Sequence, residues 1–196
     1  MFTIAITGGI ACGKSTAASY LDRMGVPVCE ADDLARAVLR KGENVRDQVV
    51  GEFGSAILGA DGEIDRAALA TVVFNNPEKL ARLNELTHPE IMRRLRCWVD
   101  EQSAYHSEVA AVIPLLFEVR DEDKWDVVVC VATQADVQRE RLLARGMTRE
   151  EAEARIRSQL RIEEKMERSD YVVFNGGSEQ LLQEQIERVM RSIRGG

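Results

Sequence analysis

The chain has 196 residues, of which 45% are hydrophobic and 30% charged, and its formal net charge is −7. Its length fits one α/β domain with insertions and is short for two independent domains, and the composition is that of an ordinary soluble globular protein. The negative charge argues against a general nucleic-acid binder. No apolar run approaches the length of a membrane span, and no basic segment precedes the first apolar stretch, so we expect a cytoplasmic protein without a membrane partner. The scattered cysteines argue against a structural zinc site or a disulfide framework.

A glycine-rich loop follows the first predicted strand. The apolar run Phe2–Ile6 leads into Gly8-Gly9-Ile10-Ala11-Cys12-Gly13-Lys14-Ser15, which matches Gly-x-x-x-x-Gly-Lys-Ser/Thr, and a helix is expected over Ser15–Met24 with Gly25 at its C-cap. Glycines let successive N–H groups point at a phosphate, and a helix start adds further donors. Lys14 can reach β- and γ-phosphates, and the Ser15 hydroxyl can ligate Mg²⁺. The pattern predicts a phosphate-binding loop; the alternative is a glycine-rich turn that happens to precede Lys-Ser.

Acidic residues follow the second predicted strand, Val26–Cys29. Ligands of open α/β sheets bind at the carboxyl ends of strands, where Glu30-Ala31-Asp32-Asp33 is expected to lie. Asp32 or Asp33 could accept the proton of an attacking hydroxyl or hold Mg²⁺ through water. Either could instead cap a helix over Leu34–Arg40.

The stretch from Asp33 to about His106 reads as helices and turns without a convincing strand. Breaks are expected at Gly54–Gly62, at Asn75-Asn76-Pro77 and at His88-Pro89, and Asp65 can cap a helix that runs to Phe74. Because the insertion is longer than a crossover requires, it is a candidate substrate-binding subdomain. His88 is interpreted more readily as an N-terminal helix residue than as a catalyst.

Two buried strands are predicted next, over Val109–Ile113 and Asp126–Val131, because both are continuous apolar runs. The first ends in Pro114-Leu115-Leu116-Phe117-Glu118, which could line a substrate cleft or form a hydrophobic plug under a loop. Thr133 is expected to cap the helix that follows the second.

Eight arginines and a lysine gather between positions 138 and 168. Interleaved glutamates favour a solvated, ion-paired helix face for part of this segment. A kinase, however, needs cations around the transferred phosphoryl group, and closing lids commonly supply them. We expect Arg141, Arg145 and Arg155 to be the cations that surround the phosphoryl group. Thr148 and Glu151 form a capping box for the helix that carries Arg155.

The last strand is predicted over Asp170–Asn175, followed by the loop Asn175-Gly176-Gly177. That loop could touch a purine ring through its backbone or be merely a turn. Ser178 is expected to cap a final helix whose core face carries Leu182, Ile186, Val189 and Ile193.

The chain resembles the dephospho-CoA kinase family over nearly its whole length. The resemblance is carried by the phosphate loop from Thr7, by Glu30-Ala31-Asp32, Leu86-Thr87-His88-Pro89-Glu90-Ile91 and Pro114-Leu115-Leu116-Phe117-Glu118, and by Gln138-x-x-Arg141 and Arg155-Ile156-x-x-Gln159. It implies an α/β three-layer P-loop fold with a five-stranded parallel sheet, a helical insertion and a helical lid. The implied parts are a nucleotide-binding core of residues 1–31, 107–138 and 169–196, an acceptor-binding insertion of residues 32–106 and a lid of residues 139–168.

The resemblance also implies transfer of the ATP γ-phosphate to the ribose 3′-hydroxyl of dephospho-CoA, with ATP and Mg²⁺ required and Asp32 as general base. The expected catalytic residues are Asp32, Lys14, Arg141 and Arg145. The expected nucleotide-binding residues are Gly8, Ala11, Cys12, Gly13, Lys14, Ser15, Thr16, Asn175 and Gly176, with Ser15 also on the metal. The expected acceptor residues are Asp32, His88, Leu116, Glu118 and Arg155.

Two positions depart from the family pattern. Glu30 stands where an aspartate is usual, and Cys12 replaces a serine. A thiol at a helix start is expected to have a lowered pKa and to be oxidisable. The sequence leaves the oligomeric state open.

Overall fold

A computed structural model describes residues 1–74 and 76–195, so Asn75 of the predicted helix break lies outside the described residues. The chain folds into two compact units. One is Ala31–Trp98, and the other combines Met1–Glu30 with the chain from Val99 onward. None of the helices in the described part of the chain has both the length and the apolar character needed to cross a bilayer.

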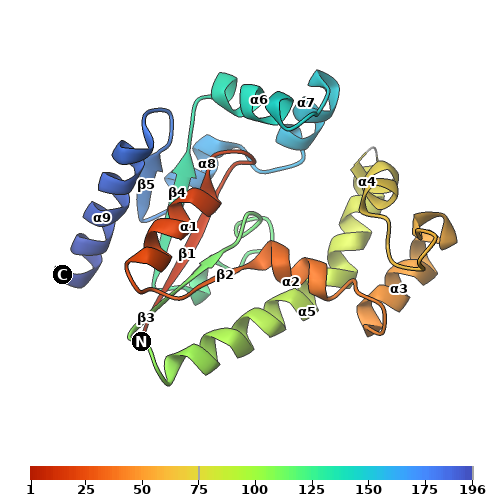
Figure 1. Cartoon of the computed structure of the whole chain (residues 1–196), viewed down its shortest axis with the longest axis horizontal. Helices are drawn as coiled ribbons and strands as arrows, with labels where there is room; N and C mark the ends of the chain where they lie inside the picture. Colours follow the sequence, from red (N-terminus) through yellow and green to blue (C-terminus); the bar gives the residue numbers. More distant parts are fainter. Residues whose placement is uncertain (75, 196) are drawn as a thin grey trace. The chain divides into compact units, whose positions relative to one another are not determined.

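A five-stranded parallel sheet forms the larger unit (Figure 1). Its strands are β1 (Phe2–Gly8), β2 (Val28–Glu30), β3 (Glu108–Val112), β4 (Val127–Ala132) and β5 (Tyr171–Phe174). The order β2-β3-β1-β4-β5, with every neighbouring pair parallel, confirms the predicted sheet. From β1 the chain continues to β2, toward one edge of the sheet, and from β3 it continues to β4, toward the other edge. Ligands of open α/β sheets bind at the carboxyl ends of such a strand pair.

The second strand begins two residues later than predicted, because Val26 belongs to the turn that ends helix α1 (Lys14–Arg23). Gly25, at φ 81°, donates to the Asp22 carbonyl, and Val26 donates back to the Leu21 carbonyl at 3.1 Å. This is a Schellman C-cap with glycine in the left-handed region. The predicted cap at Gly25 is confirmed.

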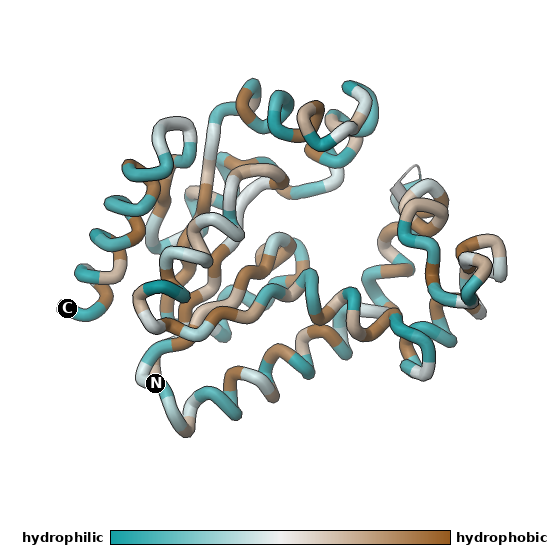
Figure 2. The backbone as a smooth tube through the Cα atoms, viewed as in Figure 1, coloured by the Kyte–Doolittle hydropathy of each residue, from teal (hydrophilic) through white to brown (hydrophobic). Residues whose placement is uncertain are grey.

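Helices cover both faces of the sheet. Helix α1 and helix α9 (Glu179–Gly195) share one hydrophobic core with the strands, and α8 (Ile162–Glu167) lies against β1 and β4. In Figure 2 the strands are mostly hydrophobic, whereas the turns of α9 alternate between hydrophilic and hydrophobic residues. Leu182, Ile186 and Val189 are buried and Ser178 caps Leu181 N–H, as predicted for an amphipathic final helix.

The fourth strand leads into α6 (Ala135–Ala144), which is followed by α7 (Arg149–Arg157). The predicted capping box of α7 is confirmed, since Glu151 N–H donates to Thr148 Oγ1 and Thr148 N–H donates to Glu151 Oε2. The predicted Thr133 cap is wrong. Gln134 is the N-cap of α6, and its side chain makes no capping hydrogen bond. The Thr133 hydroxyl donates to the Asn175 carbonyl and so does not cap the helix.

The smaller unit is helical. It holds α2 (Ala31–Ala37), α3 (Asn44–Phe53), α4 (Arg66–Phe74) and most of α5 (Pro77–Ser103). Among its described residues the only β-type pairing is an isolated bridge between Leu58 and Ile64, in agreement with the prediction of no strand. Asp65 Oδ1 accepts from the first turn of α4, which confirms that cap, and Asn76 caps α5 in the same way.

Two predicted boundaries in this unit are wrong. Helix α2 starts at Ala31, so Asp32 and Asp33 lie in its first turn and do not cap a helix beginning at Leu34. Helix α5 continues through Pro89, so His88 lies in mid-helix. A proline removes one N–H donor and frees the carbonyl four residues earlier, here that of Glu85. Pro89 and Glu85 are both exposed, so water can bond the Glu85 carbonyl and the helix continues.

Candidate active site

The predicted phosphate loop lies between β1 and α1. Gly13, at φ 93°, is the N-cap of α1, so Lys14, Ser15 and Thr16 are its first three helical residues. The N–H groups of a first helical turn have no acceptor within the helix, and the helix dipole adds positive potential there. The local geometry is therefore that of an anion-binding helix start.

Close packing requires glycine at two positions of the loop. A Cβ at Gly8, whose φ is 138°, would overlap the Val131 carbonyl oxygen. A Cβ at Gly13 would overlap the Asn175 side-chain nitrogen and lie 3.2 Å from Asn175 Cγ. Both residues also have backbone angles that disfavour any side chain. The loop thus lies directly against the ends of β4 and β5.

The Lys14 ammonium is folded over the loop. Lys14 Nζ donates to the Gly8 carbonyl at 3.2 Å and to the Gly9 carbonyl at 2.8 Å. Phosphate oxygens are stronger acceptors for an ammonium than peptide carbonyls are, because they carry charge. A bound phosphate can therefore take over this cation.

Two predicted site residues hold the loop from outside. Asn175 Nδ2 donates to the Cys12 carbonyl at 2.9 Å, and Arg141 Nη1 donates to the Ala11 carbonyl at 3.1 Å. Arg141 Nη2 also reaches the Asn175 carbonyl at 3.0 Å, which joins the two. The structure thus brings Arg141 and Asn175 to the phosphate loop from positions far along the chain.

Other arginines of residues 138–168 are ion-paired at the surface. Arg139 bridges Asp136 and Glu153, which lie on α6 and α7, and Arg168 pairs with Glu122. Arg139 and Arg168 therefore fit the expectation of a solvated, ion-paired helix face. Arg145 is exposed at the C-cap of α6, and Arg155 is half-buried on α7.

The segment after β3 is a buried anchor. Leu116 is 0% exposed, which favours the hydrophobic-plug interpretation over a cleft lining. Glu118 Oε1 accepts from Lys165 Nζ at 2.8 Å and from Leu160 N–H at 2.8 Å. Lys165 is itself fully buried and also donates to the Pro114 carbonyl at 2.7 Å. Glu118 therefore ties the chain after α7 and helix α8 to the end of β3.

Comparisons with known proteins identify the family to which this chain belongs. The family model for dephospho-CoA kinase matches residues 2–180. The chain belongs to the dephospho-CoA kinase family. A protein named dephospho-CoA kinase from Geobacillus kaustophilus (strain HTA426) is 41% identical over 193 residues, which cover 96% of this chain and 95% of that protein.

Two solved structures are similar to this chain over nearly its whole length. The structure of TT1252 from Thermus thermophilus has a TM-score of 0.83 and 36% identity, covering 100% of this chain and 98% of that one. The dephospho-CoA kinase from Campylobacter jejuni has a TM-score of 0.71 and 27% identity, covering 97% and 96%. This dephospho-CoA kinase family member therefore has the P-loop kinase fold predicted from its sequence.

One predicted property of the family member is wrong. Cys12 is fully buried, and burial raises the pKa of its thiol even though the neighbouring Lys14 acts in the opposite direction. A thiol at a helix start has a lowered pKa only where the thiolate is solvated or paired. Cys12 is therefore a protonated thiol that packs in the core.

Sequence reasoning assigned no role to two glutamines at the phosphate loop. Gln138 Nε2 donates to the Ile10 carbonyl at 2.7 Å, and Gln159 Oε1 accepts from Ile10 N–H at 2.8 Å. Both glutamines belong to the motifs that carry the family resemblance, so a signal was present. The motifs, however, do not show which residue each one contacts.

In the helical unit the two aspartates of α2 differ in their surroundings. Asp33 pairs with Arg36 one turn later, and Asp32 is exposed in the first turn. Asp32 follows the last residue of β2, Glu30, by two positions. His88 is half-buried on α5.

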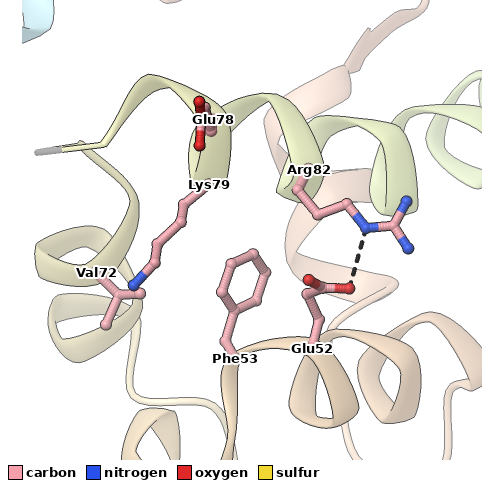
Figure 3. A pocket seen from close by; sticks show the side chains of 6 residues that line it. All are labelled: Glu52, Phe53, Val72, Glu78, Lys79 and Arg82. Carbon is pink, nitrogen blue, oxygen red and sulfur yellow. Dashed lines mark hydrogen bonds and ion pairs between the residues drawn. The ribbon is translucent and has the colours of Figure 1, made fainter.

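The helical unit also has a hollow of about 330 Å³ between α3, α4 and α5, lined by Glu52, Phe53, Val72, Glu78, Lys79 and Arg82 (Figure 3). Figure 3 shows the Phe53 ring in its middle, with the ion pair of Arg82 and Glu52 to one side. Both partners of this pair are well exposed, so water screens the interaction.

Proposed function

We propose that this protein transfers the γ-phosphate of ATP to the ribose 3′-hydroxyl of dephospho-CoA, giving CoA and ADP, the final step of CoA biosynthesis. The supporting observation is family membership over residues 2–180 combined with a phosphate loop whose outer carbonyls are already held by side chains. A loop preorganised in this way stabilises developing charge without reorganising during the reaction.

The loop and Lys14 bind the phosphates of ATP in this proposal. The N–H groups of Ala11 and Gly13 and of the first turn of α1 supply donors, and the Cys12 N–H and the Lys14 ammonium exchange backbone carbonyls of Gly8 and Gly9 for phosphate oxygens. Gly176, in the loop after β5, is the candidate for contact with the purine.

The Ser15 hydroxyl is the proposed protein ligand of Mg²⁺. It lies exposed in the first turn of α1, and hydroxyl oxygen is a hard donor that suits this ion. Among residues 1–74 and 76–195 no group of three His, Cys, Asp or Glu side chains could hold a metal ion. This donor set fits an ion that takes its other ligands from nucleotide phosphates and water, where Mg²⁺ neutralises charge on the transferred group.

Asp32 is the proposed general base for the acceptor hydroxyl, from the first turn of α2 directly after β2. Arg145 and Arg155 are proposed to approach the transferred phosphoryl group when residues 139–168 close as a lid, and Arg141 to act from its place on the loop. Closure excludes water and so suppresses ATP hydrolysis.

The acceptor is proposed to bind through the helical insertion of residues 32–106, with His88 and Arg155 as contact residues. Leu116 and Glu118 act beneath the site in this proposal, since one is fully buried and the other is bonded to Lys165. The proposed compartment is the cytoplasm. All four cysteines are free thiols, which suits a reducing environment.

The test is a coupled ADP-release assay with dephospho-CoA as acceptor. Asp32→Asn should lower kcat by about 10²–10⁴, the usual range for loss of a general base, and Asp33→Asn is the matched control with little effect. Near-wild-type turnover of Asp32→Asn would refute the base assignment. Full activity of Lys14→Ala would refute the site, and phosphorylation of AMP or shikimate but not dephospho-CoA would refute the substrate.

A further inference from the structure

Both backbone polar groups of Ile10, at the tip of the phosphate loop, are bound by glutamine side chains. Gln138, on α6, donates its amide N–H to the Ile10 carbonyl, and Gln159, just after α7, accepts the Ile10 N–H. The amide orientations are unambiguous because a carbonyl can only accept and a peptide N–H can only donate. One glutamine is used as a donor and the other as an acceptor.

The donor glutamine is one of three side chains that hold successive carbonyls of the loop. Gln138 binds the carbonyl of Ile10, Arg141 that of Ala11, and Asn175 that of Cys12. In a trans peptide the C=O and the following N–H point in opposite directions. Holding the three carbonyls outward therefore turns the N–H groups of residues 11 and 13 toward the inside of the loop, while the Cys12 N–H donates to the Gly9 carbonyl at 3.3 Å.

The loop is strained where the glutamines hold it. Ala11, a residue with a Cβ, sits at φ 58°, in the left-handed region. Such a conformation costs free energy and persists only where its surroundings enforce it. A Cβ on Gly9 would lie 2.5 Å from Gln138 Nε2, so the loop backbone presses directly on this amide.

The acceptor glutamine sits at a junction that is fixed independently of it. The next residue, Leu160, donates its N–H to Glu118 Oε1, which the buried Lys165 also holds. Ile10 in addition packs against the small apolar cluster of Ala11, Leu142 and Ala152. Replacing the Gln159 side chain therefore leaves the hydrogen bond of the neighbouring Leu160 backbone in place and removes one hydrogen bond to the loop.

We propose that Gln138 and Gln159 are positioning residues that set the two peptide planes at Ile10 and so place the Ala11 N–H and the Lys14 ammonium for the phosphates of the nucleotide. The inference rests on the proposed function. Neither glutamine touches the reacting atoms. Gln138 keeps the Ile10 carbonyl, which would repel the phosphates, turned outward. Gln159 keeps the Ile10 N–H outward, which turns the Gly9 carbonyl inward, where Lys14 Nζ donates to it at 2.8 Å.

The opposite hydrogen-bond roles permit a test with the same substitution at both positions. Gln138→Glu removes the donor and places a carboxylate against the Ile10 carbonyl, whereas Gln159→Glu keeps an acceptor for the Ile10 N–H. Each adds one negative charge near the loop, but Gln138 is buried and Gln159 half-buried, so neutral variants are also needed to separate the lost hydrogen bond from the added charge. We expect Gln138→Glu to raise the KM for ATP and the Kd for ADP by about tenfold or more, and Gln159→Glu by less than about threefold.

A neutral pair of variants covers a failure of Gln138→Glu to fold. Gln138→Met and Gln159→Met each lose the hydrogen bond without adding charge, and each should weaken ADP binding by about tenfold. Gln185→Met is the matched control. Gln185 binds both backbone groups of Phe174 on β5, at 2.8 and 2.9 Å, and the Leu181 carbonyl, none of which belongs to the phosphate loop, so its loss should change ADP binding by less than about twofold.

The measurements are calorimetric titration with ADP, steady-state KM and kcat with ATP, and Tm. Equal effects of the two Gln→Glu variants on KM and Kd would overturn the positioning role. A lower kcat and Tm with unchanged KM and Kd would also overturn it, because a merely structural loss reduces only the folded fraction. The proposed function fails differently: the wild-type protein would bind ADP yet transfer no phosphate to dephospho-CoA.

Discussion

Gly13→Ala is a direct test of how closely the phosphate loop and the Asn175 side chain are packed. The new methyl group would overlap Asn175 Nδ2 and lie 3.2 Å from Asn175 Cγ. Asn175 is 7% exposed and donates to the Cys12 carbonyl, so it can move only by breaking that hydrogen bond inside the core.

The expected magnitude has two parts. Alanine at φ 93° costs about 1–2 kcal/mol in the left-handed region. Displacing the Asn175 amide leaves a buried carbonyl without its donor, at about 1–3 kcal/mol. Gly25→Ala is the matched control, since Gly25 has φ 81° and nothing within 4 Å of the added Cβ. It should show the first part alone, so the two variants should differ by roughly 2 kcal/mol.

Urea unfolding measures this difference. Both glycines lie in the larger unit, and Trp125 fluorescence in a Trp98→Phe background reports on that unit because Trp98 belongs to the other. In thermal unfolding, each kcal/mol lowers the Tm of a protein of this size by about 2–4 °C. ADP affinity should fall only in Gly13→Ala, because only this change moves the loop.

The double variant Gly13→Ala/Asn175→Ala checks the cause. Removing the amide makes room for the methyl group, so the double variant should be more stable than the sum of the single effects by about 1–2 kcal/mol. Equal stability losses in Gly13→Ala and Gly25→Ala, or strict additivity in the double variant, would refute the proposed packing.

Three further predictions concern other parts of the molecule. Lys165→Met should cost roughly 3 kcal/mol, since it strips a buried partner from Glu118, and adding Glu118→Gln should recover part of this in urea unfolding; no recovery would contradict the coupling. Because Cys12 is buried and Cys97 exposed, mass spectrometry should show alkylation of Cys97 more than about tenfold faster; equal rates would contradict the burial. Hydrogen bonds from two arginines on α5 lower the pKa of Glu90 to about 2, so its stabilising contribution is present above its usual value of 4.5 and is lost as the pH falls toward 2. Carboxyl NMR titration measures that midpoint, and one near 4.5 would contradict it.

The phosphate loop was predictable because its chemistry is local. A strand, a run of glycines and a helix start follow each other within residues 2–24, and the hydrogen bonds that shape a helix N-terminus come from neighbouring residues. Buried parallel strands are equally visible, since both faces must be apolar and β4 is buried at every position.

The predictions that failed depended on the competition between local signals and their surroundings. Pro89 marks a helix end by local rules, yet its exposed position on α5 lets water satisfy the carbonyl that it frees. Thr133 has the chemistry of a helix cap but bonds the Asn175 carbonyl, which folding brings close. Cys12 has a helix start beside it, but burial outweighs that effect on its pKa.

The sequence by itself determined the class of site and the family, because glycine loops, apolar strands and motifs are properties of contiguous residues. Only the tertiary structure decided what holds the loop. Gln138 and Gln159 reach Ile10 across 128 and 149 positions, and Asn175 reaches Cys12 across 163. Such contacts follow from strand order and helix packing, which bring distant residues together, and no periodicity in the sequence records which carbonyl each side chain will meet.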